Sequence, residues 1–216
     1  MTDPVDDLTA TDGRVIGQRA QQTRRRLLDA TAALLREHGA LDVKVLDVAR
    51  EVGASPATFY QYFTDVEDAV LALSLELVEQ VRPIQSRFEL DWSGPDGPDL
   101  VRSIVSDYLD FWDEHGAVLR TMLLRADESD ERFREVRRQY NAPFKTAMAA
   151  KVRDAQQSGR LTRSLDPEAT AGALLAAMDR LPNYRQGFEK RGTTRAAMIE
   201  TVALLLHSSL TGRPLG

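Results

Sequence analysis

Residues 45–63, VLDVAREVGASPATFYQYF, restrict the backbone more than any other stretch of the chain. Apolar residues before Gly53 recur at helical spacing, which predicts a short amphipathic helix. Gly53 supplies the positive φ that a sharp turn at a helix end requires. Ser55 can cap the next helix with its hydroxyl, and Pro56 stands at its first position, where no backbone N–H is needed. The stretch therefore predicts two short helices joined by a tight turn, a helix-turn-helix.

The side chains of the second helix divide into an inner and an outer set. Phe59 and Tyr62 are expected to face the core, and Ala49 of the preceding helix is small where the two helices must cross. The outer set is predicted to be Ala57, Thr58, Tyr60 and Gln61. A DNA major groove is the commonest partner of such a surface.

The composition excludes several classes of protein. A chain of 216 residues forms one or two domains with a sizeable core. It contains no cysteine, which excludes disulfides, thiolate chemistry and cysteine-ligated zinc and fits a reducing compartment. No apolar run approaches the ~18 residues that a membrane span needs, and the acidic N-terminus lacks the apolar core of a signal peptide. We expect a cytoplasmic protein.

The net charge of −5 is distributed unevenly. Residues 1–13 carry four acids and no base, and residues 64–216 carry 20 bases and 24 acids. Residues 14–63 carry eight Lys or Arg against five Asp or Glu, a local excess of +3. The positive charge therefore coincides with the helix-turn-helix, as nucleic-acid binding requires.

Apolar residues recur at helical spacing along most of the chain, and we find neither a strand-period segment nor an internal repeat. The pattern predicts an all-α fold of about nine helices. The first spans 17–38, and the fourth begins after Asp65, with Asp68 three residues on as in a capping motif. This fourth helix is expected to weaken at Pro83.

Beyond a turn-rich break at 89–98, the helical pattern resumes. We expect Gly116 to interrupt it, a short helix near 117–126, and a longer helix over about 129–158 that Pro143 kinks. Two more helices are predicted near 166–182 and 194–211, separated by a polar loop that contains glycine.

This order of elements resembles the TetR family of transcriptional regulators. The likeness covers about residues 20–78 and rests on the turn glycine, the small residue Ala49 and the run T-F-Y-x-Y-F. The remaining helices match in number, length and order. The acidic, aperiodic N-terminus predicts a disordered tail over 1–16. The resemblance implies a DNA-binding domain over 17–64 and a ligand-binding and dimerisation domain over 65–216.

The resemblance also implies the DNA-reading residues. They are Lys44, Ser55, Pro56, Ala57, Thr58, Tyr60, Gln61 and Tyr62. Tyr60 and Tyr62 could instead be core aromatics. Many relatives have a lysine just inside the fourth helix, where this chain has Val66. The N–H groups of that helix end could still bind a phosphate.

A cluster of arginines precedes and enters the first helix. Its members are Arg14, Arg19, Arg24, Arg25 and Arg26. The cluster could be a solvated face, or an arm that lies along the DNA backbone or in a minor groove.

A small-molecule effector is expected from the resemblance, and large or aromatic side chains on several helices are candidates to line its pocket. They are Tyr108, Trp112, Met122, Phe144, Met148, Met178 and Tyr184. Ordinary core packing is the alternative for each, and Tyr108 with Trp112 is the preferred pair. Such a ligand would be largely apolar, either an acyl chain or a flat aromatic drug.

The last two predicted helices carry apolar residues on more than one face, which indicates burial on two sides. We expect a two-fold, four-helix dimer interface there. Its residues are Leu174, Leu181, Met198, Val202, Leu205, Leu206 and Ser209. Burial within one subunit is the alternative.

Enzymatic function is not expected. His38, His115 and His207 stand in separate helices or helix ends without metal-ligand spacing, and no phosphate-binding glycine loop or nucleophile motif occurs. We predict no metal and no cofactor. The protein is expected to be a homodimeric repressor that binds a pseudo-palindromic DNA operator and is released by its effector. A ligand-independent DNA-binding or protein-interaction adaptor is the alternative, and it predicts a filled core in place of a cavity lined by Tyr108 and Trp112.

Overall fold

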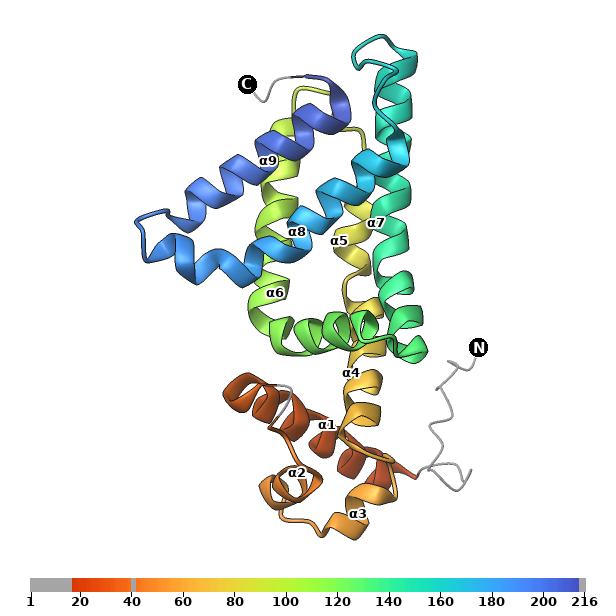
Figure 1. The fold of residues 1–216 in the computed structure, drawn as a ribbon, viewed down its shortest axis with the longest axis vertical. Helices are drawn as coiled ribbons and strands as arrows, with labels where there is room; N and C mark the ends of the chain where they lie inside the picture. Colours follow the sequence, from red (N-terminus) through yellow and green to blue (C-terminus); the bar gives the residue numbers. More distant parts are fainter. Residues whose placement is uncertain (1–16, 40–41, 214–216) are drawn as a thin grey trace. The chain divides into compact units, whose positions relative to one another are not determined.

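The computed structural model describes residues 17–39 and 42–213, and within them every regular element is a helix (Figure 1). The helices are α1 Gln18–His38, α2 Val45–Glu51, α3 Pro56–Tyr60, α4 Val66–Gln80, α5 Arg82–Arg87, α6 Gly97–Asp127, α7 Glu131–Gln157, α8 Pro167–Glu189 and α9 Arg195–Thr211. The prediction of an all-α fold with about nine helices is confirmed. The predicted tail, residues 1–16, lies outside the described residues.

The division into helices differs from the prediction at several places. α6 continues through Gly116, where an interruption was expected. An interior glycine costs a helix only about 1 kcal/mol, and buried side chains on both sides of it, such as Trp112 and Leu119, outweigh that cost. The expected weakening at Pro83 takes the form of a break: α4 ends at Gln80, and Pro83 stands in the first turn of the separate helix α5, where proline is well tolerated.

Two prolines lie inside long helices of the structure. Pro143 is within α7, and Pro182 is within α8, which continues to Glu189. The predicted end of this helix near residue 182 is therefore wrong. α8 and α9 pack against each other and run antiparallel (Figure 1).

The described residues form two compact units. One comprises the chain up to Leu77 together with Ala117–Arg137, and the other comprises Val78–Gly116 together with the chain from Arg138 onward. Each unit has its own buried core. The first is built around Leu27, Leu28, Val48, Phe59 and Phe63, and the second around Phe88, Trp92, Tyr108, Tyr140 and Phe144.

Candidate nucleic-acid interface and effector sites

The turn between α2 and α3 is held by local interactions. Gly53 has φ +67°, and the N–H of Ala54 donates to the carbonyl of Ala49 at 2.8 Å. Ser55 Oγ accepts the backbone N–H of Thr58 at 3.2 Å, and Pro56 lies in the first turn of α3. The predicted turn and N-cap are confirmed, and they hold α3 at a defined angle to α2.

The inner side of the helix-turn-helix is fully packed. Ala49 and Phe59 are completely buried, and the rings of Phe59 and Phe63 lie 5.5 Å apart. Tyr62, expected in the core, is only half-buried, and Phe63 occupies the core instead. The reason is that α3 ends at Tyr60, so helical spacing no longer sets the direction of the side chains that follow.

The predicted DNA-reading side chains remain largely accessible. Thr58 and Tyr62 are half-buried. The exposed members are Lys44, Ser55, Pro56, Ala57, Tyr60 and Gln61. Tyr60 is 53% exposed, and its ring stands edge-on to that of Phe59. This surface therefore presents hydroxyl, amide and small apolar groups on a helix whose opposite side is packed against the core.

The arginines of α1 are held by contacts within their own unit. The Arg24 guanidinium lies 5.2 Å from the centre of the Phe63 ring, and burial lowers its pKa. Arg25 pairs with Glu76 at 2.6 Å and with Asp29 at 2.9 Å. Arg26 Nη2 donates to the carbonyl of Val52 at 2.7 Å. These three side chains are thus held against their own unit, and Arg25 and Arg26 remain exposed.

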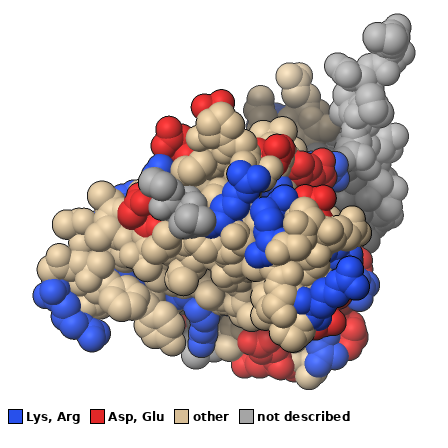
Figure 2. All heavy atoms as spheres, turned by 90° about the horizontal axis from the view of Figure 1, so that it is seen from above, with Lys and Arg blue, Asp and Glu red and all other residues tan. Residues whose placement is uncertain are grey.

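Of the other two members of the arginine cluster, Arg19 is exposed and Arg14 lies outside the described residues. On the face of the molecule shown in Figure 2, basic and acidic side chains are interspersed with uncharged surface.

The start of α4 is capped by its own carboxylates. Asp65 Oδ1 accepts the N–H of Asp68 at 2.7 Å, and Asp68 Oδ2 accepts the N–H of Thr64 at 2.9 Å. The predicted cap at Asp65 is confirmed. These carboxylates place negative charge at the helix end that was expected to bind a phosphate, and they occupy two of its N–H groups.

Five of the predicted effector residues lie in the core of the second unit. They are Tyr108, Trp112, Phe144, Met148 and Met178, each at most 3% exposed. The Tyr108 hydroxyl donates to Asp179 Oδ1 at 2.6 Å. Of the two remaining predictions, that of Tyr184 needs correction. Met122 is buried in the first unit, and Tyr184 is 57% exposed, so its side chain faces solvent and does not line a core pocket.

Two polar atoms in the second unit's core, Trp112 Nε1 and Tyr140 Oη, make no hydrogen bond of normal geometry with a described residue, although both interact with the Tyr108 hydroxyl. Burial, together with the Asp179 carboxylate, raises the pKa of both the Tyr108 and the Tyr140 hydroxyl. We had not predicted Tyr140 as a site residue, although its helical spacing with Phe144 was visible in the sequence.

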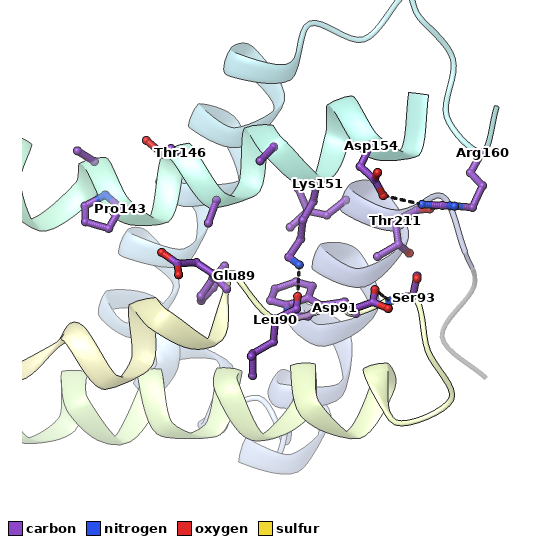
Figure 3. Close-up of a pocket in the computed structure, with 16 residues that line it drawn as sticks. Glu89, Leu90, Asp91, Ser93, Pro143, Thr146, Lys151, Asp154, Arg160 and Thr211 are labelled. Atoms are coloured by element: carbon purple, nitrogen blue, oxygen red, sulfur yellow. Dashed lines mark hydrogen bonds and ion pairs between the residues drawn. The ribbon is translucent and has the colours of Figure 1, made fainter. Parts of the chain in front are cut away.

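A pocket of about 770 Å³ lies elsewhere in the second unit, between α7, the segment from Phe88 to Ser93, and the end of α9 (Figure 3). Its lining is Phe88, Glu89, Leu90, Asp91, Trp92, Ser93, Ala142, Pro143, Thr146, Ala147, Ala150, Lys151, Asp154, Arg160, Leu210 and Thr211. None of the seven predicted effector residues is among them. A smaller pocket of about 390 Å³, beside Arg82, Gln85 and Gln139, contains none of them either.

The predicted dimer residues on α8 and α9 fall into two groups. Leu205 is 55% exposed, and Leu174, Leu181, Val202 and Ser209 are half-buried. Met198 and Leu206 are only 4% and 1% exposed. For these last two the prediction of an interface role is wrong, because the subunit's own core already covers their side chains.

Comparison with known proteins decides the family. A model described as the tetracyclin repressor-like C-terminal domain matches residues 85–215, which is more than half of the chain. A model of bacterial regulatory proteins of the tetR family matches residues 27–73. The chain belongs to the TetR family. TetR-family proteins are transcriptional regulators, and the matched N-terminal region with its helix-turn-helix makes this chain a DNA-binding regulator.

Solved structures of TetR-like regulators share the fold. The fatty acid degradation regulator FadR from Bacillus halodurans is 19% identical, with 88% of this chain and 95% of that chain covered and a TM-score of 0.63. Salmonella enterica GusR is 20% identical, with 88% and 95% covered and a TM-score of 0.63. Bacillus subtilis FadR in complex with stearoyl-CoA is 15% identical, with 88% and 98% covered and a TM-score of 0.62.

Among the helices in the described part of this TetR-family chain, none is long and apolar enough to cross a membrane. No group of three or more His, Asp or Glu side chains within residues 17–39 and 42–213 could hold a metal ion.

Proposed function

We propose that this regulator is a homodimeric transcriptional repressor that reads a pseudo-palindromic operator with α3. A small-molecule effector would release the repressor from that operator. The observation that carries the DNA-reading assignment is α3 itself. Gly53, Ser55 and Phe59 fix its backbone, while its outer side chains stay accessible. The Thr58 and Tyr60 hydroxyls can bond phosphates or base edges, and small apolar residues beside them can contact thymine methyl groups.

Dimerisation is supported by the outer faces of α8 and α9. The exposed residues of these faces include Ala173, Ala176, Ala177, Tyr184, Ala197, Leu204 and Leu205. Small side chains on α8 allow close approach, and the leucines of α9 supply apolar area for a two-fold contact. A two-fold pair would present two copies of α3 to successive half-sites of a duplex.

The proposed effector site is the aromatic cluster of the second unit. Tyr108, Trp112 and Tyr140 carry polar atoms in an apolar surrounding, and two of these atoms make no hydrogen bond of normal geometry in the described structure. A largely apolar ligand with a polar group could satisfy them. The solved FadR complex contains stearoyl-CoA, which favours testing an acyl chain beside a flat aromatic compound. Binding would favour a conformation in which the spacing of the two recognition helices no longer fits the operator.

The alternative is a ligand-independent DNA-binding or adaptor protein with the same fold. One observation favours it: Tyr108 and Trp112 line neither of the two pockets described above. A titration separates the two functions. Stearoyl-CoA and flavone are added to the complex of the protein with its operator, and release by either compound supports the repressor, whereas an unchanged complex with both supports the alternative.

The DNA-reading assignment is tested by mobility shift on the DNA upstream of the protein's own gene. We expect Tyr60→Ala to weaken binding at least tenfold, because it removes both a ring and a hydroxyl from the reading surface. The ring is half exposed, so the circular dichroism spectrum and melting temperature should hardly change. Tyr60→Phe is the matched variant that separates the hydroxyl from the ring. Unaltered binding by Tyr60→Ala would overturn the assignment.

A further inference from the structure

The pocket between α7 and the segment 88–93 contains a cation, Lys151, that forms no contact ion pair with a described residue, although the carboxylates of Asp91 and Asp154 stabilise its charge from a greater distance. Lys151 extends from α7 across the middle of the pocket, and its ammonium donates to the carbonyl of Leu90 (Figure 3). Among the described residues, no carboxylate lies within ion-pair distance of Lys151 Nζ. The side chain is half-buried, and burial lowers its pKa. Two of its three N–H donors are therefore without a protein acceptor.

A rigid aromatic wall supports this cation. Lys151 Nζ lies 4.7 Å from the centre of the Trp92 ring, within cation–π range. Trp92 is held at both ends. Its Nε1 donates to the carbonyl of Arg87 at 3.1 Å, and its own carbonyl lies 3.0 Å from His207 Nε2. The ring of Phe88 packs against it at 5.1 Å. The position of the ammonium is thus defined before any ligand arrives.

The remaining charged side chains surround this ammonium, and two of them, Asp91 and Asp154, act on it without contact. Asp154 pairs with Arg160 at 3.2 Å, and Asp91 accepts the N–H of Ser93 at 2.8 Å. Glu89 lies toward the other end of the pocket, beside Pro143 (Figure 3). A single negative charge can reach the central ammonium, but a second charge on the same ligand would meet these carboxylates.

We propose that this pocket binds a small organic monoanion, whose carboxylate pairs with Lys151 and whose apolar body lies along the walls of the pocket. Those walls are formed by Phe88, Leu90, Pro143, Ala147, Ala150 and Leu210. A volume of about 770 Å³ is in the ~300–1,000 Å³ range of small-molecule sites. The site is separate from the aromatic cluster around Tyr108, and it does not depend on whether the protein is a repressor.

The test is isothermal titration calorimetry of the full chain with three naphthalene probes of the same shape and different charge. 2-Naphthoate carries one negative charge, 2-naphthamide carries none, and 2-naphthyl phosphate carries nearly two. We expect naphthoate to bind at least tenfold more tightly than either of the others. Equal affinity for naphthoate and naphthamide, or the absence of naphthoate binding at millimolar concentration, would overturn the proposal.

Variants locate the binding site. Lys151→Met keeps the apolar stem and should weaken naphthoate binding at least tenfold while leaving naphthamide binding within about twofold. Lys151→Arg should retain most of the naphthoate affinity. Lys145→Met, on the same helix but with its amine 3.6 Å from Glu168, is the matched control and should bind like the wild type. Equal losses in Lys151→Met and Lys145→Met would refute a role for this particular ammonium.

A second variant tests the pocket without changing its charge. Ala150 lines the pocket and is otherwise exposed, so Ala150→Trp should fill the space and still fold, as circular dichroism would verify. We expect it to abolish binding of naphthoate and naphthamide alike. Undiminished binding would place the naphthalene probes elsewhere in the protein and contradict the proposal. Operator binding by the same variants is measured separately. A failure of the pocket proposal can therefore be distinguished from a failure of the proposed repressor function.

Discussion

Tyr108 and Tyr140 place two buried hydroxyls in one aromatic cluster, and only that of Tyr108 makes a hydrogen bond of normal geometry; the Tyr140 hydroxyl interacts with it without such a bond. The Tyr108 hydroxyl donates to Asp179 at 2.6 Å, whereas Tyr140 Oη makes no such bond in the described structure although the residue is only 1% exposed. We predict that Tyr108→Phe and Tyr140→Phe change the free energy of unfolding in opposite directions.

The expected magnitudes follow from the two environments. A hydrogen bond to a charged group contributes about 1.5–3 kcal/mol, so Tyr108→Phe should destabilise the fold by about 2 kcal/mol. Removing an unsatisfied hydroxyl recovers part of its desolvation cost, so Tyr140→Phe should stabilise it by about 1 kcal/mol. In a chain of this size, 1 kcal/mol shifts the melting temperature by roughly 2–4 °C.

The assay is urea denaturation followed by circular dichroism and tryptophan fluorescence, for both single variants and the double variant. The double variant measures the coupling between the two neighbouring hydroxyls. If Tyr140→Phe destabilises the protein as much as Tyr108→Phe does, then the Tyr140 hydroxyl is bonded, to a water for example, and the reasoning from an unsatisfied group is refuted.

Three other predictions concern the backbone, the dimer and the pH dependence. Gly53→Ala should lower the free energy of unfolding by about 1 kcal/mol through its positive φ alone. Gly212→Ala should cost more, because its Cβ would also lie 2.5 Å from the carbonyl oxygen of Arg160, and urea denaturation would rank the two. Leu205→Glu should convert the proposed dimer to a monomer in light scattering, whereas a persistent dimer would exclude this face. Above pH 10, the free energy of unfolding should fall as pH rises, because the buried Tyr108 and Tyr140 stay protonated in the folded state and ionise on unfolding. Melting curves recorded against pH should show a smaller fall for the Tyr108→Phe/Tyr140→Phe double variant.

The helix-turn-helix could be predicted because its determinants are local. Gly53, Ser55 and Pro56 each act on the backbone within a few residues, and the structure has the turn and the cap where these residues require them. The helix boundaries farther along were harder to predict. Gly116 and Pro182 disfavour helix locally, but tertiary packing of the residues around them outweighs that preference.

The pocket was not predicted because its residues come from distant parts of the chain. Trp92 lies in the turn-rich break at 89–98, between two predicted helices, and Leu210 belongs to the last helix. One signal was present in the sequence. Lys151 lies three residues after Met148 and four before Ala155, which places a charge on the apolar face of α7. A lysine at such a position requires either a partner or a cavity.

The anchoring of Arg24, Arg25 and Arg26 has a consequence for how this regulator searches a genome. Moving any of them onto a phosphate would break the contact to Phe63, Glu76 or Val52 that now holds it. These three arginines would therefore contribute little to counterion release from arbitrary DNA, and we expect residence on random sequence to be correspondingly short. In a cell, a larger fraction of the regulator would then be free in solution and a smaller fraction bound at non-operator sites. Occupancy of the operator would depend on the fit to the shape of the DNA and on hydrogen bonds to its bases.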